Sequence, residues 1–282
     1  MHSTPVERLI TLRDGVHLAV RIWDGPHTGR GTVVIAHGLG EHAGRYEALA
    51  AVLVEEGWHV HAADQRGHGH SNGARGAVPA IDTIRDDIIE MLHFARATAA
   101  SPIVLLGHSM GGAFAAWAVA HEPTAADALV LSSPALRTDL SVLQRVMMGT
   151  MLRLAPDTVM RNGLDVEFIS HDRAVVDAYL ADPLVHDRVS VRLASAIVTA
   201  GDMVRASASR WSTPTLLLYA GADKLVNPSG SQQFAAAAPS GVVRSTRFDA
   251  LFHEIFNETG RSEPIAMLTS WLRDLAPAAR AS

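Results

Sequence analysis

The chain has 282 residues, of which 48% are hydrophobic and 19% are charged. That balance supports a large buried core and excludes a disordered chain. The net charge of −5 argues against a nucleic-acid partner, and the absence of cysteine excludes disulfides, thiolate catalysis and cysteine-based zinc sites.

Strand and helix patterns alternate along most of the chain. The first segment, 6–23, predicts a β-hairpin, because two extended runs flank Asp14-Gly15, a dipeptide suited to a tight turn. Short apolar runs predict buried strands at 31–36, 58–63, 102–106, 128–131, 215–219 and 242–248. Helical patterns occupy 45–56, 81–100, 111–121, 230–237 and 263–275. Such alternation predicts an α/β fold with a mostly parallel central sheet covered by helices on both faces.

One stretch, 136–211, interrupts the alternation. It carries helical patterns and no strong buried strand, and it is too long for a plain connecting loop. We predict a helical cap inserted into a core made of 1–135 and 212–282. Four of the nine methionines, Met147, Met148, Met151 and Met160, fall between residues 142 and 160 of this cap. They either pack the cap onto the body or form an adaptable surface for acyl chains and transient membrane contact.

The location of the protein is also predicted from the apolar patterns. The first eight residues lack the basic end and the apolar run of a signal peptide. The strongest apolar helix, 113–120, is far shorter than the roughly 20 residues that a membrane span needs. We expect a cytoplasmic protein, peripheral at the membrane where the cap touches it.

A nucleophile motif lies between a strand and a helix. Gly107-His108-Ser109-Met110-Gly111 matches Gly-x-Ser-x-Gly, with an apolar strand directly before it and a helix directly after it. The turn between them must be sharp, and it projects the hydroxyl of Ser109 above the sheet. The alternative is an ordinary strand-to-helix turn with a capping serine. We predict that Ser109 is a catalytic nucleophile.

A serine nucleophile needs a base, and in this arrangement the chain order is Ser, then Asp or Glu, then His. Four histidines follow Ser109, namely His121, His171, His186 and His253. Of these, His253 follows the last predicted strand, where the base must lie. The alternative is a loop histidine packed on neighbouring phenylalanines.

The acid that orients the base should follow the preceding strand. Asp223 stands there, after a strand end and a glycine turn. Asp249 is the weaker candidate, since it precedes His253 in the same loop. The alternative role for Asp223 is a turn or helix cap.

Acyl transfer also needs two backbone N–H donors aimed at the developing oxyanion. We assign the N–H of Met110, directly after the nucleophile, and that of Leu39, in the loop after the strand 31–36. His37 precedes Ser109, against the order rule, and is interpreted as a hydrogen-bonding brace of this loop.

These motifs resemble the monoacylglycerol lipase and lysophospholipase branch of the α/β-hydrolases, particularly the bacterial monoacylglycerol lipases. The resemblance covers most of residues 31–258, and the motif most specific to this branch lies in the first loop. The matching pieces are His37-Gly38-Leu39-Gly40-Glu41-His42, Gly44-Arg45-Tyr46, Asp64-Gln65-Arg66-Gly67-His68-Gly69, 107–112, 131–135, 221–226, His253-Glu254 and Asn257-Glu258, with the cap run 179–186. In that family the oxyanion donors match Leu39 and Met110.

The resulting hypothesis is hydrolysis of an ester that carries one acyl chain, most simply a monoacylglycerol, without a cofactor or metal. Glu41 and Arg45 lie in the loop of Leu39 and are predicted to bind the glycerol, or else to pair with each other and brace the loop. Alternatives are another monoester such as a lysophospholipid, an amide or peptide, and a ligand-binding protein that retains the fold. The histidine pairs 59/61 and 68/70 offer no third ligand for a metal.

Overall fold

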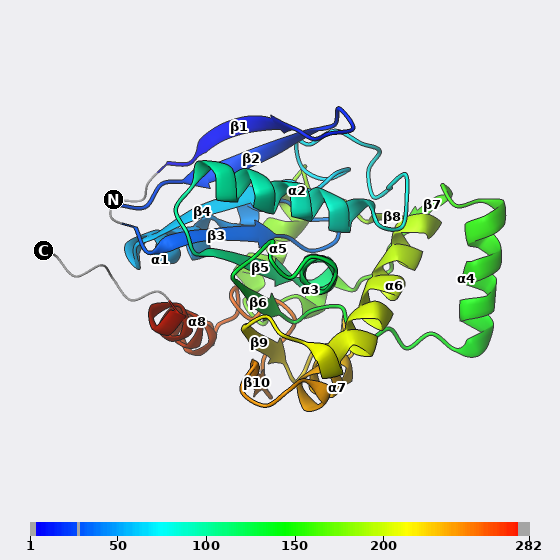
Figure 1. The fold of residues 1–282 in the computed structure, drawn as a ribbon. Coiled ribbons are helices and arrows are strands. Elements are labelled where there is room, and N and C mark those ends of the chain that lie inside the picture. Colours follow the sequence, from blue (N-terminus) through cyan, green and yellow to red (C-terminus); the bar gives the residue numbers. More distant parts are fainter. Residues whose placement is uncertain (1–3, 27–28, 276–282) are drawn as a thin grey trace, which may run out of the picture.

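The computed structural model describes residues 4–26 and 29–275. Its centre is a sheet of eight strands in the order β1-β2-β4-β3-β5-β6-β9-β10, parallel from β4 to β10, with β1 and β2 antiparallel at one edge (Figure 1). The strands are β1 (Val6–Thr11), β2 (His17–Trp23), β3 (Gly31–Ala36), β4 (Trp58–Ala63), β5 (Ile103–His108), β6 (Ala128–Ser132), β9 (Thr215–Ala220) and β10 (Val243–Phe248). The predicted fold class is confirmed.

The predicted hairpin is confirmed in β1 and β2. Its turn is closed by a hydrogen bond of 2.8 Å from the N–H of Leu12 to the carbonyl of Val16, and Gly15 has a φ of +84°. Residues with a side chain rarely adopt that conformation, so the turn requires the glycine at this position. The signal-peptide prediction concerned the first eight residues, of which residues 1–3 lie outside the described residues.

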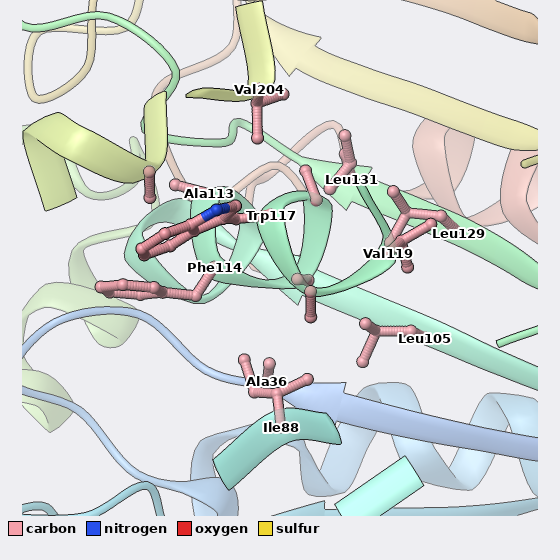
Figure 2. Packing of buried hydrophobic residues seen from close by; sticks show 14 of the residues in the cluster. Ala36, Ile88, Leu105, Ala113, Phe114, Trp117, Val119, Leu129, Leu131 and Val204 are labelled. Atoms are coloured by element: carbon pink, nitrogen blue, oxygen red, sulfur yellow. The ribbon is translucent and has the colours of Figure 1, made fainter. Parts of the chain in front are cut away.

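Helices cover both faces of the sheet, as predicted. They are α1 (Glu47–Glu55), α2 (Thr83–Thr98), α3 (Ser109–His121), α7 (Ser229–Ala237) and α8 (Ser262–Leu275), with a short 3-10 turn η1 (Ala43–Tyr46) before α1. Side chains of β5 alternate between the two cores: Leu105 packs with α2 and α3, whereas Val104 packs with α1 and α8. Figure 2 shows Phe114 and Trp117 of α3 packed in the first of these cores.

The segment 136–211 contains α4 (Val142–Leu154), β7 (Val159–Arg161), η2 (Val166–Phe168), α5 (Arg173–Ala181), β8 (Arg188–Ser190), α6 (Val191–Ser207) and η3 (Ala208–Arg210). The sequence patterns did not indicate β7 and β8, which pair antiparallel in this segment, because three-residue strands leave almost no alternation in the sequence. The helix α4 stands apart from the sheet (Figure 1) and buries none of its residues.

The last helix of that segment behaves differently. Leu193, Ala196, Ala200 and Val204 of α6 are buried in the same core as α3. Figure 2 shows Val204 close to that core. Most of α6 is therefore packed into the body, although it falls within the range predicted as cap. Among the described residues, no helix is both long and apolar enough to cross a membrane.

Candidate active site

Ser109 occupies a strained turn between β5 and α3. Its φ is +54°, a left-handed conformation that non-glycine residues rarely adopt. The neighbouring glycines make the turn feasible, since a Cβ on Gly107 would lie 2.7 Å from the carbonyl oxygen of Gly111, and one on Gly111 would collide with the carbonyl of Ala36. The predicted sharp turn is confirmed, and its strain holds the serine at the carboxyl end of β5.

His253 and Asp223 form a buried pair. The Nδ1–H of His253 donates to Oδ2 of Asp223 over 2.7 Å, and their side chains are only 5% and 2% exposed. The other carboxylate oxygen of Asp223 accepts the N–H groups of Leu225 and Val226, each at 2.9 Å. Hydrogen bonds within its own loop thus hold Asp223 in place. Because His253 contacts Asp223 through Nδ1, its other ring nitrogen, Nε2, is available to another group.

The pair has pKa values suited to an orienting acid and a base. Burial lowers the pKa of His253, but the charge of Asp223 and the hydrogen bond to it outweigh burial and raise it above 6.5. Burial raises the pKa of Asp223, but the histidine charge and the hydrogen bonds bring it below 3.8. An aspartate that stays ionised stabilises the imidazolium that forms when the histidine accepts a proton.

The sheet brings these residues to one place. Ser109, Asp223 and His253 follow β5, β9 and β10, three parallel strands whose carboxyl ends lie at the same edge. The ring of His108, next to the serine, lies 4.7 Å from the ring of His253. Burial, with the charge of His253, lowers the pKa of His108 to about 4, so this neighbour adds no charge near neutral pH.

The loop after β3 passes directly against the serine. A Cβ on Gly38 would lie 3.3 Å from the Cβ of Ser109. Leu39 of this loop and Met110 of α3 both line the cavity that holds Ser109. His37 braces the loop, as predicted, because it donates to the carbonyl of Gly38 over 2.8 Å and accepts the N–H of Gln65 over 2.8 Å.

Glu41 and Arg45 do not line that cavity. The two side chains contact each other at 2.6 Å, and Arg45 also makes a bidentate pair with Glu254 at 2.6 and 2.8 Å. The structure therefore favours the alternative of mutual pairing over direct contact with glycerol. Glu254 was not assigned a role from the sequence, and the signal that could have found it is a carboxylate directly after His253.

Glu258 is a second carboxylate without a predicted role. Its buried side chain accepts the N–H groups of Phe252 and Thr259 at 2.7 and 3.0 Å and pairs with Nδ1 of His171 at 2.7 Å. The ring of His171 stacks on Phe252 at 3.6 Å. Glu258 thus holds the loop before His253 and fastens it to the segment that precedes α5.

The cavity at Ser109 has a volume of about 730 Å³. Its apolar wall includes side chains of Leu39, Met110, Met148, Ile197, Val198 and Leu225, of which Met148, Ile197 and Val198 come from the segment 136–211. Ser109 and Asp223 both border it. An elongated apolar molecule with one ester group could therefore rest against the hydroxyl. Within the described ranges, no cluster of three His, Asp or Glu side chains is arranged to hold a metal.

Comparison with known proteins agrees with this geometry. The family model of serine aminopeptidase S33 matches residues 27–260. A monoacylglycerol lipase of Mycolicibacterium smegmatis is 32% identical over 96% of this chain and 98% of its own length. The solved structure of a monoacylglycerol lipase from Paleococcus ferrophilus has a TM-score of 0.83 and 31% identity, over 91% of this chain and 98% of that one.

A third relative is longer. An uncharacterized abhydrolase domain-containing protein of Dictyostelium discoideum is 33% identical over 96% of this chain, which spans 29% of that protein. The resemblance inferred from the sequence motifs is confirmed, and the protein is a hydrolase. The chain belongs to the serine aminopeptidase S33 family of α/β-hydrolases.

Proposed function

We propose that the enzyme hydrolyses the ester bond of a monoacylglycerol to a fatty acid and glycerol, with Ser109 as nucleophile. The observation that carries the proposal is that a strained serine and the aspartate of a buried His–Asp pair both border one largely apolar cavity of about 730 Å³. Such a cavity is within the size range of sites that enclose one small ligand.

The proposed mechanism uses residues of this chain alone. Oγ of Ser109 attacks the ester carbonyl while Nε2 of His253 takes its proton, and Asp223 orients the imidazole and stabilises its charge. The N–H groups of Leu39 and Met110 receive the oxyanion. The protonated histidine returns the proton to the departing glycerol oxygen, and water then cleaves the acyl-enzyme by the same steps.

The lining of the cavity favours an acyl ester over the N-terminal residue of a peptide. An aminopeptidase needs an acceptor for the substrate's α-ammonium group. The two carboxylates that line the cavity, Asp139 and Asp223, already have partners: Asp139 pairs with Arg137 at 3.2 Å and accepts from Asn227 at 2.6 Å. An apolar wall without a free carboxylate suits an acyl chain.

The substrate is tested by turnover of mono- and triacylglycerols of equal chain length. We expect kcat/KM for the monoacylglycerol to be higher by roughly 100-fold or more, because a capped cavity of this size cannot admit two further chains. An aminoacyl nitroanilide should be cleaved far more slowly than a nitrophenyl ester. Equal rates on mono- and triacylglycerol would leave a general esterase, and faster nitroanilide cleavage would support a peptidase.

A lysophospholipid is the second candidate, and one side chain favours it. Lys224 follows Asp223 and borders the cavity, and among the described lining residues it is the cation without a hydrogen bond or ion pair. A phosphate group could pair with it. The panel above therefore includes a lysophosphatidic acid, with Lys224→Ala as the matched variant. A loss confined to the phosphate-bearing ester would support this candidate.

We also propose that α4 contacts a lipid surface. Val142, Leu143, Val146, Met147 and Leu154 expose their side chains along this helix, which lies on the far side of α6 from the sheet in Figure 1. The helix carries Arg145 and Arg153 and no acidic residue. An exposed apolar helix with basic side chains is typical of interfacial helices.

Vesicle binding tests the role of α4. Leu143→Glu should weaken co-sedimentation with vesicles that contain anionic phospholipid by about ten-fold or more, since burying one such side chain contributes about 2 kcal/mol. Leu9→Glu is the control, because Leu9 of β1 is 70% exposed and Leu143 is 68% exposed. If both variants sediment like the wild type, α4 does not bind lipid.

A further inference from the structure

A buried ion cluster joins the loop after β3 to the loop after β10. Arg45 lies between two carboxylates, with Nη1 2.6 Å from Oε2 of Glu41, and Nη1 and Nη2 2.6 and 2.8 Å from the two oxygens of Glu254. The three side chains are 10%, 5% and 6% exposed. Buried pairs of this geometry fix the relative position of the segments that carry them.

On one side, the cluster is hydrogen-bonded to the loop that carries Leu39. Oε1 of Glu41 accepts the backbone N–H of Gly38 over 2.5 Å and the hydroxyl of Tyr46 over 2.8 Å. Gly38 precedes Leu39 and lies against Ser109. The carboxylate therefore sets the conformation of the backbone from which one of the proposed oxyanion donors projects.

On the other side, the cluster includes a residue of the loop that carries His253. Glu254 is the residue after His253, and its backbone N–H donates to the carbonyl of Ile169 over 2.8 Å. Its Oε2 also accepts from the side chain of Asn257 over 2.8 Å. Any displacement of Glu254 is thus transmitted directly to the backbone of His253.

Glu41 and Arg45 keep their charges near neutral pH. Burial raises the pKa of Glu41, but the charge of Arg45, followed by those of nearby histidines, brings it to about 2. Burial lowers the pKa of Arg45, but Glu254 and Glu41 raise it above its ordinary value. Glu254 and Glu41 both raise the pKa of His253 electrostatically and so favour the imidazolium.

None of the three side chains lines the cavity at Ser109. The guanidinium is covered on one face by the ring of Tyr179, 4.6 Å away. Three of its N–H groups donate to the carboxylates, and a substrate hydroxyl that took one of these donors would have to displace a buried ionic hydrogen bond. Direct glycerol binding is therefore disfavoured.

We propose that Glu41, Arg45 and Glu254 are positioning residues. They fix the loop that carries Leu39 relative to the loop that carries His253, and they act on the reaction through Leu39 and His253. The inference rests on the proposed function of Ser109 and His253. A small displacement of a catalytic group lowers the rate of the chemical step more than it weakens substrate binding.

The test uses Glu254→Gln, which keeps the size and one hydrogen-bonding oxygen and so preserves the fold better than loss of Arg45 would. The matched control is Glu56→Gln, because Glu56 forms a bidentate pair with Arg273, at 2.7 and 2.5 Å, between α1 and α8. Both variants are assayed on monoacylglycerol and on a nitrophenyl ester, well below their melting temperatures. Each is also titrated with an alkyl boronic acid, which forms a tetrahedral adduct on an activated serine.

We expect Glu254→Gln to lower kcat by about 10- to 100-fold on both esters with KM within about two-fold. Boronic acid affinity should fall in parallel, and the midpoint of the rise of kcat/KM with pH should move down, because a negative charge beside His253 is lost. Glu41→Gln should behave alike, and Glu56→Gln should match the wild type.

The contrary results separate the two proposals. A rise in KM on monoacylglycerol alone would overturn positioning in favour of glycerol contact. An unchanged kcat in Glu254→Gln and Glu41→Gln, with a wild type that binds the boronic acid, would overturn the positioning role alone. A wild type that neither binds the boronic acid nor reacts with a fluorophosphonate would overturn the proposed function, and this inference with it.

Discussion

Replacement of Ser109 by alanine should abolish turnover, with a loss of about 10⁶ in kcat, and should abolish labelling by a fluorophosphonate. The physical reason is that only a serine whose proton can pass to a neighbouring base attacks phosphorus or a carbonyl at a useful rate. Mass spectrometry of the labelled wild type should find one adduct, on the peptide that contains Ser109. His253→Ala should lose activity to a similar degree, because the members of such a triad act as a unit.

A matched control for this experiment is Ser133→Ala. Among the described non-glycine residues, Ser109 and Ser133 are the two with positive φ. Ser133 is buried, whereas Ser109 is half-buried and borders the cavity. Its hydroxyl accepts the N–H of Ala220 over 3.3 Å. Backbone strain alone therefore does not distinguish the two serines, and Ser133→Ala should keep its label. Labelling that persists in Ser109→Ala would refute the nucleophile assignment.

Replacement of Asp223 by asparagine should lower kcat by about 10⁴-fold in a folded protein. An amide keeps the shape of the carboxylate but cannot stabilise the imidazolium, and it favours the wrong tautomer of the ring. The pH profile should change as well. Activity rises with pH as His253 loses its proton, and the aspartate charge holds that pKa above 6.5. Without that charge, the midpoint of kcat/KM should move to lower pH.

Asp249→Asn serves as the comparison, since Asp249 was the weaker candidate for the acid. Its side chain is 83% exposed and pairs with Arg247 at 2.8 Å, away from His253. An exposed pair of this kind contributes about 0–1 kcal/mol, so this variant should retain near wild-type kcat and pH profile. Greater damage from Asp249→Asn than from Asp223→Asn would mean that the acid has been assigned to the wrong carboxylate.

Much of this architecture could be predicted from local sequence signals. The apolar run of β5, the glycines on either side of Ser109 and the helical pattern of α3 are short-range features, and each specifies its own backbone. The order of Ser, Asp and His along the chain, together with the strand that precedes each, then led to Asp223 and His253. These two side chains do meet, at 2.7 Å.

The cap was less predictable from its sequence. The apolar residues of α4 and α6 have similar helical spacing, yet α4 buries none of its residues and α6 joins the main core. Periodicity reports which face of a helix is apolar, but not whether another element covers that face. Only the tertiary structure decided that α6 packs on α3 while most of the apolar side chains of α4 remain exposed.

The ion cluster of Glu41, Arg45 and Glu254 shows most clearly which features depend on the tertiary structure and not on local sequence. Sequence spacing placed Glu41 and Arg45 in one loop and left open whether they bind substrate or each other. The deciding partner is Glu254, which is 209 positions from Arg45 along the chain. An ionic contact depends on distance in space and on burial, which local sequence does not encode. The sequence by itself determined the fold class, the strained serine and the order of the proposed triad residues, whereas the tertiary structure decided which charges meet.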